Sequence, residues 1–274
     1  MIERKIPSTG EILPVIGLGS WLQFDVGPSS IEREALKEVL KKMAELGGRL
    51  IDSSPMYGKS EEVIGALTTE LGIAGKFFYA TKVWTNGEKP GIEQMEDSMR
   101  KMRRSTMDLM QVHNLVDYQT HLRTLNKWKS EGKVRYTGVT HYTSSSHEKL
   151  ESIIRSEKID FVQFNYSIRE INAERNLLPA AMDRGVAVII NVPFDQNSLF
   201  KIVKGKSLPE WTADYDIKSW GQFFLKYIIS HPAVTCVIPG TSAPEHLIDN
   251  MGAGFGTLPD EKGRMKMVSY IEKL

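Results

Sequence analysis

Eight short apolar runs recur along this chain, and segments with a helical apolar spacing separate them. The runs are Val15–Leu18, Arg49–Ile51, Phe77–Ala80, Leu109–Val112, Val134–Val139, Phe161–Phe164, Val186–Val192 and Thr235–Ile238. Continuous apolar runs of this length are typical of strands that are buried on both faces of a parallel sheet. Eight strand–helix units in 274 residues match a closed (β/α)8 barrel, which takes about 250 residues. We therefore predict an α/β fold, a single (β/α)8 TIM barrel that occupies residues 1–274 as one domain.

Seven segments between the runs have the apolar spacing of amphipathic helices. They are Ile31–Leu46, Ile92–Met102, His121–Trp128, Glu148–Ile154, Arg175–Met182, Trp220–Ile229 and Pro244–Met251. In the first segment the apolar residues follow at intervals of four from Ile31 to Met43, and Gly47-Gly48 then ends it as a helix C-terminus should. Alternating strands and helices of this kind favour a parallel sheet.

The charge balance and the cysteine content exclude several classes of protein. The chain has 35 basic and 34 acidic side chains and a net charge of +1, so no global field attracts nucleic acid or a membrane. Cys236 is the one cysteine, which rules out an internal disulfide and fits a reducing compartment. Residues 1–10 have no apolar core of a signal peptide, and no run reaches transmembrane length. We expect a cytoplasmic protein, with the reservation that an export signal could have been trimmed.

Four polar residues stand at or just beyond the ends of successive apolar runs. Asp52 and Tyr57 follow the second run, Lys82 follows the third, and His113 follows the fourth. In a (β/α)8 barrel the active site forms at the C-terminal ends of the strands. We therefore expect these four side chains to meet at one mouth of the barrel.

Together the four side chains can protonate a carbonyl oxygen. A tyrosine hydroxyl has a reference pKa near 10, and an adjacent ammonium lowers it. Lys82 would supply that ammonium to Tyr57, and Asp52 would hold Lys82 in place. A neutral His113 would orient the carbonyl, and the hydride would have to come from a cofactor. Taken singly, each residue has an ordinary structural role: a cap, a packed aromatic, a surface charge or a core histidine. Their occurrence at successive strand ends favours the chemical interpretation.

The motifs around these residues resemble those of the aldo-keto reductase family in order and spacing. They are Gly17-Leu18-Gly19-Ser20-Trp21, Ile51-Asp52-Ser53-Ser54-Pro55-Met56-Tyr57-Gly58-Lys59-Ser60-Glu61, Thr81-Lys82-Val83-Trp84 and Val112-His113-Asn114. The likeness extends from Gly17 to Asn250, and the segment from Asp52 to Glu61 is its most specific part. It implies a (β/α)8 barrel, an extended nicotinamide cofactor, a catalytic tetrad of Asp52, Tyr57, Lys82 and His113, and no metal.

The resemblance also implies a cofactor, NADP(H) by preference with NAD(H) compatible, and a set of residues that hold it. These are Gly19, Ser20, Trp21, Asp52, Thr140, His141, Gln163, Asn191, Val192, Pro193, Phe194, Ile238, Pro239, Gly240, Thr241, Ser242, His246, Asp249 and Asn250. Within this set Gln163 and the turn at Thr140-His141 match the segments that bind the nicotinamide carboxamide. Ser242 is placed to cap a helix that opens near Pro244, and a helix N-terminus suits a phosphate.

This chain departs from the family pattern at four positions. His141 stands where the family has asparagine. Asn191 stands where the family has the aromatic residue that stacks on the nicotinamide. Gly240 and His246 stand where many relatives place basic residues against the 2′-phosphate. These departures predict a modest preference for NADPH over NADH.

The expected partner is a small carbonyl substrate, with no nucleic acid and no membrane, and a monomer would suffice. Trp21, Met56, Trp84 and His113 are the candidate substrate contacts, and the two tryptophans favour an apolar or aromatic aldehyde or ketone. Two alternatives remain open at this point. One is a Schiff-base lyase or aldolase with Lys82 as the nucleophile. The other is a regulatory subunit that binds the cofactor with little turnover.

Overall fold

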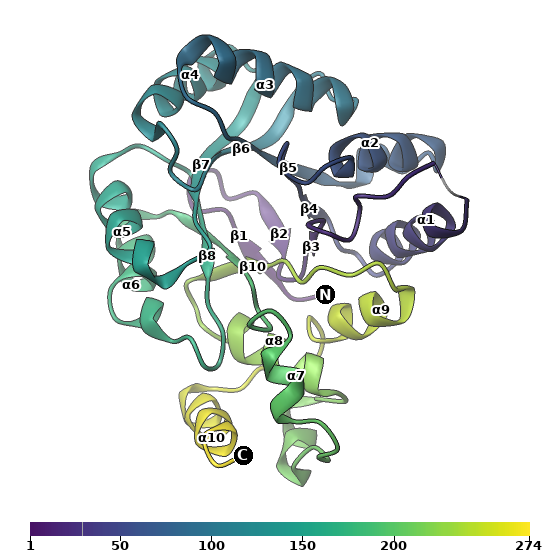
Figure 1. The fold of residues 1–274 in the computed structure, drawn as a ribbon. Helices are drawn as coiled ribbons and strands as arrows, with labels where there is room; N and C mark the ends of the chain where they lie inside the picture. Colours follow the sequence, from purple (N-terminus) through teal and green to yellow (C-terminus); the bar gives the residue numbers. More distant parts are fainter. Residues whose placement is uncertain (29) are drawn as a thin grey trace.

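The computed structural model describes residues 1–28 and 30–274, and its centre is an eight-stranded parallel sheet (Figure 1). The strands follow one another in sheet order exactly as in chain order, from β3 to β10. Their bounds are β3 (Leu18–Gly19), β4 (Leu50–Asp52), β5 (Phe78–Val83), β6 (Met107–His113), β7 (Val134–Thr140), β8 (Phe161–Asn165), β9 (Ala187–Asn191) and β10 (Val234–Val237). All eight predicted runs overlap or adjoin a strand of this sheet, although only the last residue of the first run belongs to β3.

Hydrogen bonds between the segment before β3 and the end of β10 close the sheet into a barrel. The amide of Gly17 donates to the carbonyl of Val237 over 2.8 Å, and the amide of Gly19 donates to Pro239 over 3.2 Å. Glycine is needed here because a Cβ on Gly17 would lie 2.7 Å from the carbonyl oxygen of Leu50. The predicted (β/α)8 barrel is therefore confirmed, and its closure depends on glycines that the apolar pattern does not reveal.

Helices cover the outside of the barrel (Figure 1). Their bounds are α1 (Ser30–Glu45), α2 (Ser60–Glu70), α3 (Glu88–Lys101), α4 (Tyr118–Ser130), α5 (His147–Ser156), α6 (Leu177–Arg184), α7 (Ser198–Ile202), α8 (Trp220–Ile229), α9 (Pro244–Gly252) and α10 (Glu261–Ile271). The seven predicted helices are present, but α2, α7 and α10 were not predicted. In α2 the apolar spacing is weak because its buried residues include Ser60, Glu61, Gly65 and Thr68.

The inside of the barrel is apolar at its N-terminal end. A hairpin of β1 (Glu3–Lys5) and β2 (Ile12–Pro14), which the sequence pattern did not predict, brings Ile6 and Leu13 into this core. Large side chains from the first halves of the strands fill the rest, among them Leu50, Phe78 and Phe161. Cys236 is fully buried in the same cluster. The buried charged pair of Asp52 and Lys82 lies at the opposite, C-terminal end of the strands.

None of the helices in residues 1–28 and 30–274 is long and apolar enough to cross a membrane.

Candidate active site

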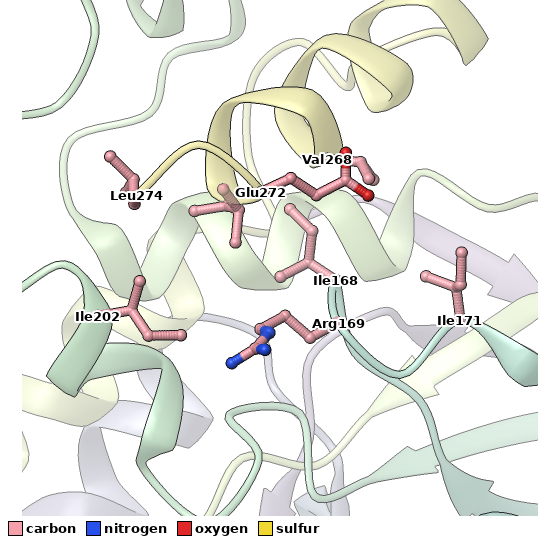
Figure 2. Close-up of a pocket in the computed structure, with 8 residues that line it drawn as sticks. Ile168, Arg169, Ile171, Ile202, Val268, Glu272 and Leu274 are labelled. Atoms are coloured by element: carbon pink, nitrogen blue, oxygen red, sulfur yellow. The ribbon is translucent and has the colours of Figure 1, made fainter.

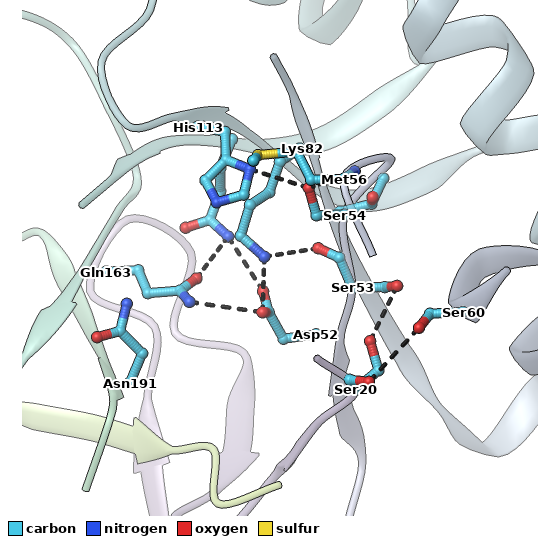
Figure 3. A network of polar contacts seen from close by, with 12 residues as sticks. Ser20, Asp52, Ser53, Ser54, Met56, Ser60, Lys82, His113, Gln163 and Asn191 are labelled. Atoms are coloured by element: carbon cyan, nitrogen blue, oxygen red, sulfur yellow. Dashed lines mark hydrogen bonds and ion pairs between the residues drawn. The ribbon is translucent and has the colours of Figure 1, made fainter. Parts of the chain in front are cut away.

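The four residues of the predicted tetrad come together at the C-terminal ends of three neighbouring strands, and Figure 3 shows three of them, Asp52, Lys82 and His113. Asp52 is the last residue of β4, Lys82 lies near the end of β5, and His113 ends β6. Tyr57 lies on the loop that joins β4 to α2. In the register of these strands Asp52 pairs with Ala80 and Lys82 pairs with Gln111, so Lys82 and His113 each lie two residues beyond the partner of the preceding site residue.

A buried ion pair between Lys82 and Asp52 is the centre of this cluster. The ammonium Nζ of Lys82 donates to Oδ2 of Asp52 over 2.6 Å and to the carbonyl oxygen of Ser53 over 2.6 Å. Burial alone would lower the pKa of Lys82, but the charge of Asp52 and the hydrogen bonds of the ammonium outweigh burial, and the pKa is raised. Lys82 is therefore a charged group at neutral pH.

Two glutamines complete the environment of Asp52. The amide Nε2 of Gln111 donates to Oδ1 of Asp52 over 3.4 Å and to Oε1 of Gln163 over 2.8 Å. The amide Nε2 of Gln163 donates to Oδ2 of Asp52 over 3.5 Å. Burial raises the pKa of Asp52, whereas the charge of Lys82 and these amide donors favour the ionised carboxylate.

Tyr57 lies over the ammonium and beside the imidazole. Nζ of Lys82 is 5.1 Å from the centroid of the Tyr57 ring, and the ring of His113 meets it edge-on at 5.8 Å. The pKa of Tyr57 is not lowered overall, as the sequence argument expected it to be. Burial dominates and raises the pKa of the phenol, while the charge of Lys82 acts in the predicted, opposite direction. Tyr57 is therefore a protonated phenol at neutral pH.

His113 is held neutral. Burial, assisted by the charge of Lys82 and by His141, lowers the pKa of His113 to about 2. Its Nδ1 lies 2.9 Å from the hydroxyl Oγ of Ser54. The neutral form that the sequence argument required of His113 is thus the form that this environment favours.

The predicted substrate contacts lie at the rim of the same mouth. Trp21 is 57% exposed, Trp84 is 42% exposed and Met56 is 40% exposed. They follow β3, β5 and β4, which are neighbours in the sheet. Exposed aromatic side chains on one side of a mouth form an apolar wall for a ligand.

The loop that carries Trp84 is fixed by side chains of the helices behind it. Oε1 of Gln94 accepts a hydrogen bond from the amide of Trp84, and Nε2 of Gln94 donates to the carbonyl of the same residue over 3.2 Å. The imidazole of His121 contacts the carbonyl of Thr85 through Nε2 over 2.7 Å. The indole of Trp84 is therefore exposed on a well-anchored backbone.

The residues predicted to hold the nicotinamide lie at the ends of the next three strands. Thr140 ends β7, Gln163 lies in β8 and Asn191 ends β9. His141 follows Thr140, and its Nδ1 accepts hydrogen bonds from the backbone amides of Tyr142 and Thr143 over 3.0 and 3.3 Å. Asn191 donates from Nδ2 to the carbonyl of His141 over 3.3 Å, and its buried Oδ1 has no hydrogen-bond partner in the described residues.

The backbone after β9 is strained. Val192 has φ of +49°, in the left-handed region that β-branched residues rarely adopt. Phe194 turns away from the strand ends and packs on Phe200 and Phe224, with ring centroids 4.9 and 6.5 Å apart. Strain of this kind is concentrated at binding and catalytic sites. Pro193, which lies between Val192 and Phe194 in the chain, is buried.

The remaining predicted cofactor residues lie along the barrel seam and on α9. Ile238, Pro239 and Gly240 follow β10 next to Gly19 across the seam, while the amide of Ser20 donates to the carbonyl of Asp52 on the other side. His246 is exposed on α9. Asp249, also on α9, accepts hydrogen bonds from Ser219 over 2.6 Å and from Gln222 over 2.9 Å. Asn250 is buried near the start of α8.

The predicted cap of α9 is wrong. Ala243, not Ser242, occupies the N-cap position, and no side chain caps the first turn. Thr241 provides the local hydroxyl contact instead, because its Oγ1 accepts from the amide of Ala243 over 3.1 Å. Proline at the first helical position needs no partner for an amide, which reduces the need for a cap.

A separate cavity of about 560 Å³ lies outside the mouth, between the loop after β8, α7 and α10 (Figure 2). Its lining is mostly aliphatic, with Arg169 and Glu272 as its charged side chains. It contains none of the predicted site residues. This hollow lacks the buried, coupled titratable groups that surround the tetrad.

Sequence reasoning missed two residues of the site, Gln111 and Ser54. Gln111 stands two residues before His113 in β6, and side chains two apart in a strand share a face. A polar residue inside an apolar run, in phase with a candidate catalytic residue, is the signal that could have identified it. Ser54 follows Asp52 by two residues, but its contact with His113 depends on the pairing of three strands.

Comparison with known proteins places these residues in a family. The family model described as "Aldo/keto reductase family" matches residues 15–268. The chain is 26% identical over 259 residues to methylglyoxal reductase YeaE of Escherichia coli K12, which covers 91% of this chain and 89% of that protein. It is 23% identical to an NADH-specific methylglyoxal reductase of the same organism, over 91% of this chain and 93% of that protein.

A solved structure has the same fold. The aldo/keto reductase from Klebsiella pneumoniae in complex with NADP and acetate superposes with a TM-score of 0.81 and 20% identity, over 99% of this chain and 96% of that chain.

Proposed function

The chain belongs to the aldo/keto reductase family, and on this premise we propose that it reduces an aldehyde or ketone to an alcohol. The hydride comes from NADP(H), with NAD(H) compatible, and the proton comes from Tyr57. The observation that carries the proposal is the buried ion pair of Lys82 and Asp52 beneath the Tyr57 ring, beside a neutral His113. Perturbed titratable groups that converge at one mouth are typical of a catalytic site.

In this proposal Tyr57 protonates the carbonyl oxygen while the carbonyl carbon is reduced. The reduced nicotinamide supplies the hydride. The O–H of Tyr57 donates to the substrate oxygen, and the proton crosses as negative charge develops there. The phenolate that remains faces the ammonium of Lys82, which stabilises it. Asp52 keeps that ammonium charged and in position.

His113 orients the substrate. A neutral imidazole that carries its proton on Nε2 donates a hydrogen bond to the same carbonyl oxygen as Tyr57. Two donors directed at one oxygen fix the carbonyl plane and favour the oxyanion-like transition state. The apolar wall of Trp21, Met56 and Trp84 takes the remainder of the substrate, so we propose an apolar or aromatic carbonyl compound.

The described residues fit a nicotinamide at the ends of β7, β8 and β9. Because Nδ1 of His141 accepts from two backbone amides, the proton of the neutral ring is on Nε2. Nε2–H can then donate to the carboxamide, as the family's asparagine amide does. The unpartnered Oδ1 of Asn191 is a buried acceptor at the same place. Asn191 supplies no aromatic stack, so we propose that the nicotinamide is held mainly by hydrogen bonds.

The preference for NADPH is proposed to be modest. Gly240 has no side chain to meet a 2′-phosphate, and its position at the seam limits what could replace it, because a Cβ there would lie 3.2 Å from the carbonyl oxygen of Gly19. The first turn of α9 contributes free amides and a helix dipole worth about 0.3–1 kcal/mol. One relative is named NADH-specific, and one structural neighbour was solved with NADP. These two observations support a site that accepts either cofactor.

The arrangement works against a lyase. A Schiff-base nucleophile needs a neutral amine, whereas Lys82 is paired with Asp52 and its pKa is raised.

The direct test of the proposal is to titrate the protein with NADPH by fluorescence, and then to follow NADPH oxidation with a panel of aldehydes and ketones. Saturable binding with turnover supports a reductase. Binding without turnover on any carbonyl would point instead to a regulatory role, and the absence of binding would overturn the proposal.

A further inference from the structure

Ser54 and His113 make a buried contact that the proposed mechanism does not explain. Ser54 lies on the loop after β4, and His113 ends β6, with the end of β5 between them. Oγ of Ser54 is 2.9 Å from Nδ1 of His113 (Figure 3). The Ser54 side chain is fully buried.

The direction of this hydrogen bond follows from the other partner of Ser54. Its Oγ already accepts a hydrogen bond from the amide of Met56 over 3.2 Å. The hydroxyl proton needs an acceptor because the group is shielded from water, and a buried unpaired donor costs about 1–3 kcal/mol. Among the residues that the structure describes, Nδ1 of His113 is the acceptor within hydrogen-bond range of this hydroxyl.

A serine that donates to Nδ1 determines the tautomer of the neutral imidazole. Nδ1 must present its lone pair, so the ring proton is carried by Nε2. In the opposite tautomer Nδ1–H would donate to Ser54, the serine proton would lose its acceptor, and Nε2 would present a lone pair to the mouth. A lone pair would repel the carbonyl oxygen that His113 is proposed to bind.

We propose that Ser54 is a positioning residue, which orients the His113 ring and fixes its proton on Nε2 so that the ring donates toward the substrate. This inference rests on the proposed carbonyl reduction for its consequence in catalysis, but not for the tautomer itself. Ser54 contacts neither substrate nor cofactor in this account, and it acts only through His113.

The tautomer can be measured without any turnover. In protein labelled with ¹⁵N-histidine, long-range ¹H–¹⁵N correlation spectra distinguish a protonated ring nitrogen from an unprotonated one, and His113→Asn identifies the signals. We expect a protonated Nε2 and an unprotonated Nδ1 for His113 at neutral pH. A wild-type His113 with its proton on Nδ1 would overturn the inference, whether or not the protein reduces carbonyls and even if no Ser54 variant folds.

Kinetics then test the positioning role. Ser54→Ala should mix the two tautomers and lower kcat/KM for the carbonyl about tenfold, the scale of one hydrogen bond. The dissociation constant of NADPH should stay within a few-fold. Ser54→Thr, which keeps the hydroxyl, should restore both the tautomer and the rate. Ser98→Ala removes a buried hydroxyl from α3 and is the matched control. It should change neither the tautomer of His113 nor the rate. An Ser54→Ala variant with the wild-type tautomer and rate would contradict the proposal.

Discussion

Nζ of Lys82 lies 2.6 Å from Oδ2 of Asp52, and the two side chains are only 1% and 3% exposed. A buried ion pair is a weak contributor to stability, because desolvation of both charges offsets their attraction. The ion pair lies under the ring of Tyr57, where the ammonium can stabilise the phenolate that forms on proton transfer. This role explains the ion pair better than a contribution to the free energy of folding does. Removing one partner should therefore affect stability and catalysis in separable ways.

Lys82→Met should abolish most carbonyl reduction and also destabilise the protein. Asp52 would be left as a buried, unpaired carboxylate, which costs about 3–5 kcal/mol. Chemical denaturation of the variant should show that loss. The double variant Asp52→Asn with Lys82→Met removes the orphaned charge, so it should recover much of the stability but none of the activity. Good aldehyde reduction by Lys82→Met at pH 7 would show that Tyr57 does not depend on this ammonium.

The buried histidines should contribute less to stability as the pH drops below 6.5. Burial lowers the pKa of His141, His147 and His231, and lowers that of His113 to about 2. Below pH 6.5 the unfolded chain binds protons at these positions that the folded chain does not, so the free energy of unfolding rises with pH. The contribution is complete above pH 6.5 and is lost on acidification.

His113→Asn provides the check on this pH dependence. Removing one such histidine should reduce the slope of the unfolding free energy against pH by about 1.4 kcal/mol per pH unit below pH 6. Urea titrations of both proteins between about pH 5 and pH 7.5 measure the two slopes. Equal slopes would mean that His113 is protonated in the folded protein as readily as in the unfolded chain.

The strand pattern was enough to predict eight strands that alternate with helices, because each strand contains a short run of mostly apolar residues, but it did not by itself establish that the sheet closes. It could not predict the hairpin of β1 and β2, whose strands are three residues long and mostly exposed in β1. Nor could it predict α2, since the buried face of that helix includes Ser60, Glu61 and Thr68. The apolar spacing along the sequence predicts the helices and strands that contribute apolar side chains to the core. It does not predict the helices and strands whose buried side chains are polar.

The sequence predicted where the candidate site residues lie, but it did not predict all of their pKa shifts. Strand ends placed Asp52, Lys82 and His113 correctly, because the topology of a barrel brings those ends together. The net pKa shift of Tyr57 was not predictable, since it depends on how burial competes with the charge of Lys82. The contact of Ser54 with His113 was also beyond the sequence, because it forms across a strand that lies between them.

Trp84 should determine which carbonyl compounds the protein accepts. Its indole is exposed at the rim on an anchored loop, so Trp84→Ala should raise KM for an aromatic aldehyde several-fold and change KM for a small aliphatic aldehyde little. Steady-state kinetics with the two substrates measure the difference. Trp211→Phe, a change of a tryptophan that packs on Phe223 and Tyr270 away from the mouth, is the control. An equal effect of Trp84→Ala on both aldehydes would exclude a role in selectivity.

His246→Arg should strengthen the binding of NADPH and leave that of NADH nearly unchanged. The guanidinium is permanently charged, and a charge-assisted hydrogen bond to the 2′-phosphate is worth about 1.5–3 kcal/mol, or roughly 10- to 150-fold in affinity. His246→Gln is the uncharged control and should resemble the wild type. Dissociation constants for both cofactors decide the matter. A wild-type preference for NADPH above about a thousandfold would mean that another basic residue already holds the phosphate.

The most direct test of the whole account is Tyr57→Phe, measured as single-turnover oxidation of bound NADPH by an aldehyde that the wild type reduces. The variant lacks only the hydroxyl, so the dissociation constant of NADPH should stay within a few-fold. The rate of the chemical step should fall by at least about 10²–10⁴, the usual contribution of a positioned general acid. Loss of the rate with retained cofactor binding is the predicted result. A Tyr57→Phe variant that oxidises NADPH at nearly the wild-type rate would contradict the account, because another group would then have to donate the proton.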